Sequence, residues 1–209
     1  MIAPLQKEDL LIRDMEGAEG GEDCFHVWWL GQSGFLLKWN GHYLLFDPYL
    51  SDSLTRKYQD TDKPHTRMSE RVLDPAHLSF VKVVTSSHNH TDHLDRETLL
   101  AIGEAAGGVV LVLPEANEGF AKERLRGVPV DYVGINEKAA TRVDAFTFEG
   151  IAAAHNEVER DEEGRCRFLG CCVTGGAWRV SRSGATLWQE GLVGQLTAGA
   201  PDRGVRPIT

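Results

Sequence analysis

The segment that decides the fold reads Val81-Lys82-Val83-Val84-Thr85-Ser86-Ser87-His88-Asn89-His90-Thr91-Asp92-His93. It begins as a short β-branched run of the kind that forms a buried strand. Three of the chain's eight histidines then fall within six residues, from His88 to His93. Open α/β folds place their binding sites at the carboxyl ends of the strands, which is where this cluster lies. The segment therefore predicts an α/β domain with a metal site after this strand.

The spacing inside the motif indicates what it binds. His88 and His90 are two apart on an extended segment, so they project to the same side and can share one cation. Asp92 and His93 turn toward a second position beside it. Imidazole and carboxylate ligands without a thiolate suit Zn²⁺, Mn²⁺ or Fe²⁺. The alternative, a His-rich surface loop, is disfavoured by the buried strand directly before the motif.

The rest of the chain favours an α/β or α+β class, because strand-like runs alternate with helical patterns. Asn40-Gly41 between two apolar runs predicts a hairpin. Asp95–Ala106 is expected to be a helix, with Asp95 as its N-cap and Gly107-Gly108 as its end, and Glu115–Leu125 is expected to be another. The polar stretch Pro48–His77 predicts a functional loop. The expected strands are 25–30, 35–39, 43–46, 81–85, 109–113, 130–133, 141–148, 151–154, 168–174 and 177–181.

Length and charge restrict the class of protein. The 209 residues fit one domain, which we place at 24–209 after an acidic N-terminal arm, 1–23. Lys+Arg 22 against Asp+Glu 31 gives a net charge of −9, which disfavours nucleic acid and anionic membranes as partners. No secretion signal and no 18-residue apolar stretch is found, so we expect a cytoplasmic protein. We expect a small-molecule substrate, which can carry a phosphate, and leave self-association into a homo-oligomer open.

The motif also carries a family resemblance. His-x-His-x-Asp-His after a hydrophobic strand resembles the signature of the metallo-β-lactamase-fold hydrolases. Trp28-Trp29-Leu30-Gly31-Gln32-Ser33-Gly34-Phe35 and Asp47-Pro48-Tyr49-Leu50-Ser51-Asp52 are similar to the branch that includes the L-ascorbate-6-phosphate lactonase-like proteins. The resemblance runs from about Val27 to the C-terminus. It implies an αββα sandwich with a one- or two-metal site at one edge of the sheets.

The resemblance implies a first metal site formed by His88, His90 and His155, where His155 closes the run Ile151–Ala154. Zn²⁺ is the expected cofactor, with Mn²⁺ or Fe²⁺ as alternatives, as one or two ions. A metal-bound hydroxide would attack a lactone, an ester or a phosphodiester.

Two acids and a further histidine complete the expected site. Asp92 and His93 would begin a second metal site, and Asp92 would also orient the attacking water or take its proton. Asp47 would hold a ligand imidazole in place. Without the resemblance, Asp47 would be interpreted as a turn residue before Pro48.

The chain departs from the family pattern in two places. The family has an Asp that bridges both metals, in His-Ser-Gly-Asp-Thr, whereas this chain has Arg182-Ser183-Gly184-Ala185-Thr186. Ala185 has no ligating atom. The pattern also continues past the segment like Pro207-Ile208-Thr209 to a final His ligand, so we expect a sandwich that is incomplete at its C-terminal end. The second hypothesis is therefore a catalytically impaired or truncated metal-binding relative without hydrolase activity.

Overall fold

Short apolar runs separated by turn residues form a first sheet of six strands in the order β1-β2-β3-β4-β5-β6. The first three strands are antiparallel, and β3 to β6 are parallel. The hairpin predicted at Asn40-Gly41 is confirmed: both residues have positive φ, 47° and 79°, as a tight hairpin turn requires. The strands are β1 (Phe25–Gly31), β2 (Gly34–Trp39), β3 (His42–Phe46), β4 (Val83–Thr85), β5 (Val109–Pro114) and β6 (Val130–Ile135).

A second sheet has the order β11-β10-β9-β8-β7 and is antiparallel except for the β10–β11 pair. The single strand expected over 141–148 is wrong, because the chain reverses at Asp144, whose φ is 53°. Aspartate tolerates this left-handed conformation and favours turns. The strands expected over 168–174 and 177–181 are present and pair as an antiparallel hairpin around Gly175 and Gly176. The strands are β7 (Ala140–Val143), β8 (Phe146–Ala152), β9 (Leu169–Gly175), β10 (Trp178–Arg182) and β11 (Arg203–Val205).

The helices are α1 (Glu8–Gly17), α2 (Ser53–Tyr58), α3 (Arg96–Ala106), α4 (Glu118–Arg124) and α5 (Leu192–Gly199), with short 3₁₀ turns η1 (Pro75–His77) and η2 (Glu115–Asn117). The start of α3 is as predicted, since the Asp95 side chain accepts a hydrogen bond from Thr98 N. Its end is also as predicted, at Gly107 with φ 69°. The helix expected over 115–125 begins with the 3₁₀ turn η2, and its α-helical part, α4, starts only at Glu118. No sequence pattern described above predicts α2, α5 or β11.

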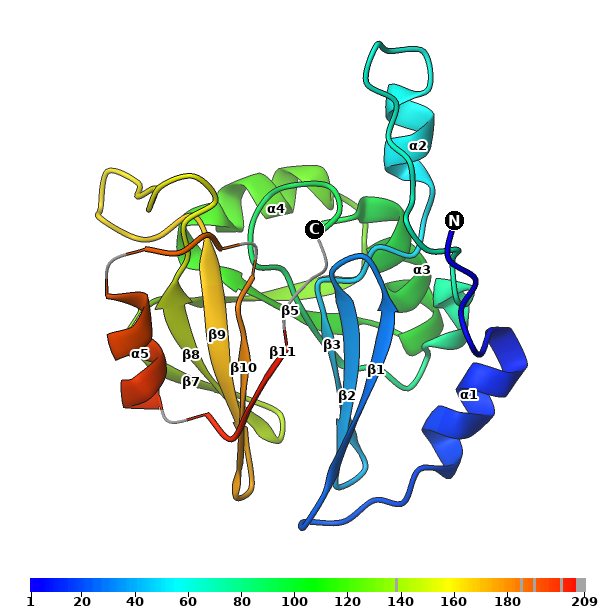
Figure 1. The fold of residues 1–209 in the computed structure, drawn as a ribbon, viewed down its shortest axis with the longest axis horizontal. Helices are drawn as coiled ribbons and strands as arrows, with labels where there is room; N and C mark the ends of the chain where they lie inside the picture. Colours follow the sequence, from blue (N-terminus) through cyan, green and yellow to red (C-terminus); the bar gives the residue numbers. More distant parts are fainter. Residues whose placement is uncertain (138, 185, 190, 200, 206–209) are drawn as a thin grey trace.

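These elements form four layers (Figure 1). One apolar core lies between the first sheet and the helices α1, α3 and α4, and it includes Met15, Ile102 and Leu125. The other lies between the two sheets and includes Phe46 and Phe148. With α5 beside the second sheet, the expected αββα sandwich is confirmed. The computed structural model describes the whole chain except residues 138, 185, 190, 200 and 206–209.

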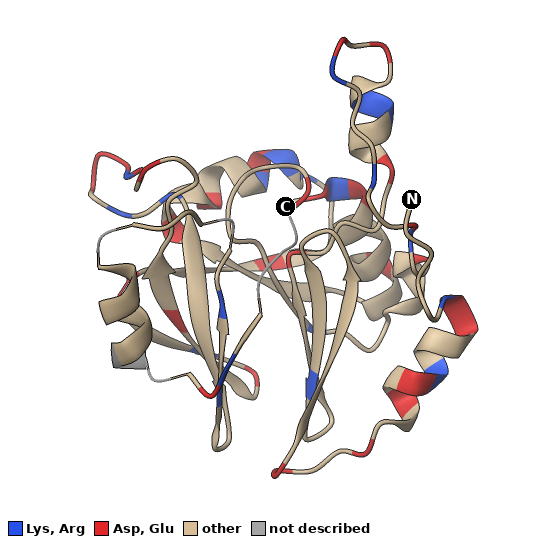
Figure 2. Ribbon diagram, in the orientation of Figure 1, with Lys and Arg blue, Asp and Glu red and all other residues tan. Residues whose placement is uncertain are grey.

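Acidic and basic residues both occur along α1 and α4 (Figure 2). Arg13 stands among acids on α1, and Lys122 and Arg124 stand beside Glu118 and Glu123 on α4. These helices therefore present no purely basic face. Within the described part of the chain, no helix has both the length and the apolar character needed to cross a membrane.

Candidate functional site

Both sheets contribute to the site at one shared edge. In the first sheet, β3 ends directly before Asp47, and the histidine motif follows β4. In the second sheet, His155 follows β8 and Arg182 ends β10. A backbone hydrogen bond from Leu169 N to Ser87 O, 3.1 Å, joins the two halves. The carboxyl ends of neighbouring parallel strands meet at the same edge, which explains why residues distant in sequence gather here.

Three histidines converge at this edge. The ligand atoms of His88, His90 and His155 lie within 4.8 Å of one another, and they are the one group of three or more metal-capable side chains among the described residues. His88 Nε2 is 3.0 Å from His90 Nδ1. A tetrahedral zinc ion with its usual bond lengths places ligand nitrogens about 3.3 Å apart. The donor set and its spacing therefore fit a divalent ion.

Phe168 forms an apolar wall against all three imidazoles. Its ring centroid lies 4.9 Å from that of His88, 6.1 Å from His90 and 5.6 Å from His155. No sequence pattern indicates this contact, because an aromatic residue at the start of an expected strand is typical of core packing. Phe168 directly precedes β9, and the hydrogen bond of Leu169 to the β4 loop holds it there.

The imidazoles are kept in the form that binds metals. Burial, followed by the charge of His93, lowers the pKa of His88 to about 2. Burial and the neighbouring His155 also lower the pKa of His90. Neutral imidazoles offer a free nitrogen lone pair, so these two side chains can bind a cation at neutral pH.

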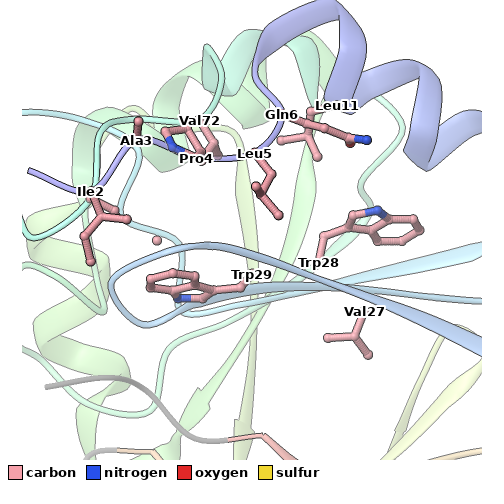
Figure 3. Close-up of a pocket in the computed structure, with 12 residues that line it drawn as sticks. Ile2, Ala3, Pro4, Leu5, Gln6, Leu11, Val27, Trp28, Trp29 and Val72 are labelled. Carbon is pink, nitrogen blue, oxygen red and sulfur yellow. The ribbon is translucent and has the colours of Figure 1, made fainter.

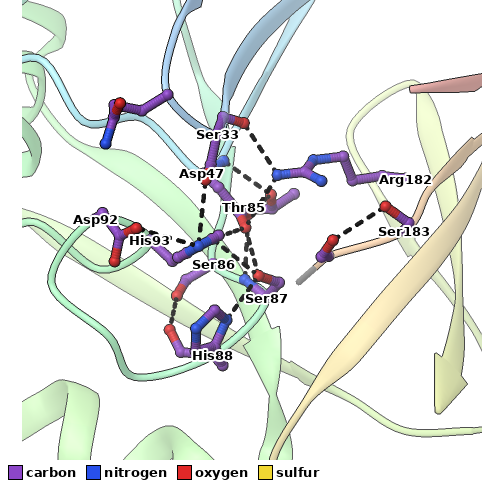
Figure 4. A network of polar contacts seen from close by, with 12 residues as sticks. Ser33, Asp47, Thr85, Ser86, Ser87, His88, Asp92, His93, Arg182 and Ser183 are labelled. Atoms are coloured by element: carbon purple, nitrogen blue, oxygen red, sulfur yellow. Dashed lines mark hydrogen bonds and ion pairs between the residues drawn. The ribbon is translucent and has the colours of Figure 1, made fainter. Parts of the chain in front are cut away.

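Asp47 is the centre of a buried polar network (Figure 4). Its Oδ2 lies 2.7 Å from His93 Nδ1, and its Oδ1 accepts hydrogen bonds from Thr85 Oγ1 at 2.8 Å and Ser87 N at 3.1 Å. Ser87 Oγ also donates to Oδ2. The predicted contact of Asp47 with an imidazole is therefore present. Asp47 has φ 39°, a left-handed backbone conformation that Asp tolerates better than most residues, and these hydrogen bonds hold the residue in it.

Arg182 compensates the charge of Asp47. Burial alone would raise the pKa of Asp47, but the charge of Arg182 and the hydrogen bond from His93 outweigh it and hold that pKa well below its ordinary value. Arg182 Nη2 lies 3.5 Å from Asp47 Oδ2 and donates to Ser33 O at 3.0 Å. Sequence reasoning missed both Arg182 and Ser33, since an Arg at a strand end and a Ser in a turn are usually exposed.

Asp92 and His93 adjoin the three-histidine cluster. His93 Nε2 lies 3.2 Å from Ser33 Oγ and 3.6 Å from Asp92 Oδ2. The His93 ring centroid is 4.1 Å from that of His88. The structure thus brings all five predicted ligands together. Asp92 and His93 supply two candidate ligands for a second ion, whereas His88, His90 and His155 supply three for the first. Ala185, where the resemblance places a bridging Asp, lies outside the described residues.

An apolar pocket of about 440 Å³ lies elsewhere, between the N-terminal segment and β1 (Figure 3). Leu5, Trp28, Trp29 and Val72 are among its walls. The indole N–H groups are already bound, that of Trp28 to Asp14 and that of Trp29 to the Gln32 carbonyl, so the rings present apolar surface. The histidine motif does not line this pocket.

Comparison with known proteins identifies the family. The family model described as "Beta-lactamase superfamily domain" matches residues 26–200. The chain belongs to this superfamily. An uncharacterized protein of Mycobacterium tuberculosis is 32% identical to this chain over 130 residues. The aligned part makes up 62% of this chain and 33% of the relative. The chain thus spans about a third of the length of this curated relative.

Solved structures of the superfamily show the same fold. A possible metal-dependent hydrolase from Veillonella parvula aligns with a TM-score of 0.65 at 19% identity, over 86% of this chain and 69% of that one. An isothiocyanate hydrolase from Delia radicum gut bacteria aligns with a TM-score of 0.63 at 18% identity, over 87% of this chain and 70% of that one. At such identities the likeness supports the fold of this β-lactamase superfamily domain.

Proposed function

We propose that this β-lactamase superfamily domain is a metal-dependent hydrolase that holds a divalent ion on His88, His90 and His155. The observation that carries the proposal is the convergence of these three imidazoles at the edge shared by both sheets. These three imidazoles would hold the ion, and three protein ligands are the number that catalytic zinc sites use. A bound ion supplies Lewis-acid activation of the substrate and lowers the pKa of water to about 7. Zn²⁺ suits these ligands best, with Mn²⁺ or Fe²⁺ as alternatives.

The chain's own residues would perform the remaining tasks. Asp92 is partly exposed beside the cluster, so its carboxylate can orient the attacking water and take its proton. Phe168, whose ring lies against all three imidazoles, would limit the access of bulk water to them. Asp47 fixes the orientation of His93 through their hydrogen bond.

For the substrate we propose a small molecule with a lactone, ester or phosphodiester bond. The sequence similarity to the L-ascorbate-6-phosphate lactonase-like branch supports this range. Two structural neighbours, a possible metal-dependent hydrolase and an isothiocyanate hydrolase, support hydrolysis as the class of reaction. Cytoplasmic location stays a prediction from the sequence.

The test combines metal content with turnover. Wild-type protein, stripped with a chelator and reloaded with zinc, is assayed with p-nitrophenyl acetate, a six-membered lactone and bis(p-nitrophenyl) phosphate. We expect turnover of at least one of them that disappears on stripping and in His155→Ala. His77→Ala, at an exposed histidine in η1, is the matched control and is expected to retain metal and activity. Protein that binds only trace zinc under metal-replete conditions would contradict the proposal.

A further inference from the structure

The guanidinium of Arg182 is a buried cation that connects the two sheets. Its side chain is 1% exposed, although it stands at the end of β10. It donates to the carbonyl of Ser33 in the turn between β1 and β2, lies beside Asp47 after β3, and is 5.8 Å from the Phe35 ring. All three partners belong to the first sheet or its loops, so the cation crosses the interface next to the histidine cluster.

The hydrogen bonds of Arg182 do not by themselves explain why a cation is buried at this position, because only one of its three nitrogen atoms takes part in them. Among the described residues, Arg182 Nε and Nη1 are buried without a hydrogen-bond partner. A cavity of about 10 Å³ adjoins the side chain, which is room for about one water molecule. Taking a guanidinium out of water with two donors unmatched is costly. The feature that offsets this cost is the buried carboxylate of Asp47.

The position expected for a second metal ion lies beside this carboxylate. His93 and Arg182 bind the same oxygen, Asp47 Oδ2, at 2.7 and 3.5 Å. The second nitrogen of His93 faces Ser33 Oγ at 3.2 Å, and the nearby Asp92 adds one carboxylate. Among the described residues, His93 and Asp92 are the two side chains available here as ligands. Two protein ligands next to a fixed positive charge make a poor site for a divalent ion, because the like charges repel each other.

We propose that Arg182 supplies the positive charge that a second metal ion would otherwise bring beside Asp47 and His93. The centre therefore holds one divalent ion, on His88, His90 and His155. This inference rests on the proposed function, and it assigns Arg182 as a positioning residue of a mononuclear centre.

Metal stoichiometry tests the inference directly. Chelator-stripped wild-type protein is titrated with zinc alone by calorimetry, and the metal content is checked by mass spectrometry. We expect one equivalent in the wild type and also in Asp92→Asn, and none in His155→Ala. Two equivalents in the wild type, with the second lost in Asp92→Asn, would overturn the inference but leave the proposed function intact. No bound zinc would overturn both.

Arg182 variants test the role of the charge. Arg182→Met is expected to take up a second zinc ion that binds more weakly than the first, since the charge of Asp47 is no longer compensated. Arg182→Lys, which keeps the charge, is expected to stay at one equivalent. A stoichiometry of one in both variants would overturn the role assigned to Arg182.

A double-mutant cycle keeps the test decisive if Arg182→Met does not fold. Asp47→Asn leaves the Arg182 charge uncompensated beside the cluster, so zinc affinity is expected to fall about tenfold. Asp47→Asn/Arg182→Met removes both charges and is expected to regain most of that affinity. If the double variant binds zinc as weakly as Asp47→Asn, the charge of Arg182 does not act on the metal centre and the inference is overturned.

Discussion

Arg182 Nη2 lies 3.5 Å from Asp47 Oδ2, and both side chains are 1% exposed. The two residues come from different sheets, at the ends of β10 and β3. The ion pair thus fixes the distance between the sheets at the edge where His88 and His155 meet. A buried ion pair of this kind contributes little net stability. Replacing one of the two residues, however, leaves the other as an uncompensated buried charge.

We therefore expect Asp47→Asn to lower the free energy of unfolding of the metal-free protein by about 3–5 kcal/mol. Urea denaturation followed by circular dichroism measures this. Asp131→Asn, at an exposed position on β6, is the matched control and is expected to change stability by less than about 0.5 kcal/mol. Equal effects of the two substitutions would show that the Asp47 charge is not structurally coupled to Arg182.

The stability of the metal-free protein should fall as the pH falls below 6.5. The pKa of His88 is about 2 in the folded chain against an ordinary value of 6.5. Between these values the unfolded chain binds a proton at His88 that the folded chain excludes, so the free energy of unfolding decreases by up to about 1.4 kcal/mol per pH unit. Asp47, whose pKa is lowered on folding, acts in the same direction below about pH 4.

Denaturation curves at pH 7.5, 6.5, 5.5 and 4.5 measure this slope. His88→Asn is expected to flatten it between pH 6.5 and 4.5, whereas His77→Asn, at an exposed position, should retain the wild-type slope. An unchanged slope in His88→Asn would show that another group controls the acid sensitivity.

Phe168→Ala should weaken zinc binding by about tenfold, because the groups that surround ligand imidazoles fix their orientation. A competition assay with a chromogenic chelator measures the affinity. Phe25→Ala is the control: this half-buried ring packs edge-on against Trp178 at 5.1 Å, outside the histidine cluster. A similar loss of zinc affinity in both variants would mean that general destabilisation, not the Phe168 contact, is responsible.

Lys38→Met should destabilise the protein by about 1–3 kcal/mol, because it leaves helix-end carbonyls unpaired. Lys38 is buried on β2, and its Nζ donates to the carbonyls of Met15, Glu16 and Ala18 at 2.9, 3.2 and 3.0 Å. These carbonyls end α1, which has no basic residue in its own last turn. Thermal unfolding against Lys57→Met, an exposed control on α2, gives the comparison. A change no larger than in the control would exclude this capping role.

Local signals were enough to predict much of the fold. The Asn40-Gly41 turn, the N-cap at Asp95 and the end at Gly107 act through backbone conformations that neighbouring residues determine. The reversal at Asp144 was missed because an Asp between two β-branched or aromatic runs is only a weak turn signal. The helix α5 was missed for a related reason, since its eight residues include two Gly and one Thr, which have low helix propensity.

Residue patterns alone were sufficient for a strand-rich α/β or α+β class and for the motif His88 to His93, because strand patterns, turns and ligand spacing depend on residues close in the chain. The αββα sandwich and the ligand role of His155 came from the family resemblance that this motif carries. The folded chain was needed to show that His155 lies at that motif, as the resemblance implied, and it alone revealed the contacts of Phe168 and the burial of Arg182 against Asp47. These contacts join residues 67 to 135 positions apart in the sequence, as from His88 to His155 and from Asp47 to Arg182. Their proximity comes from the packing of two sheets, which brings strand ends together that no local pattern relates.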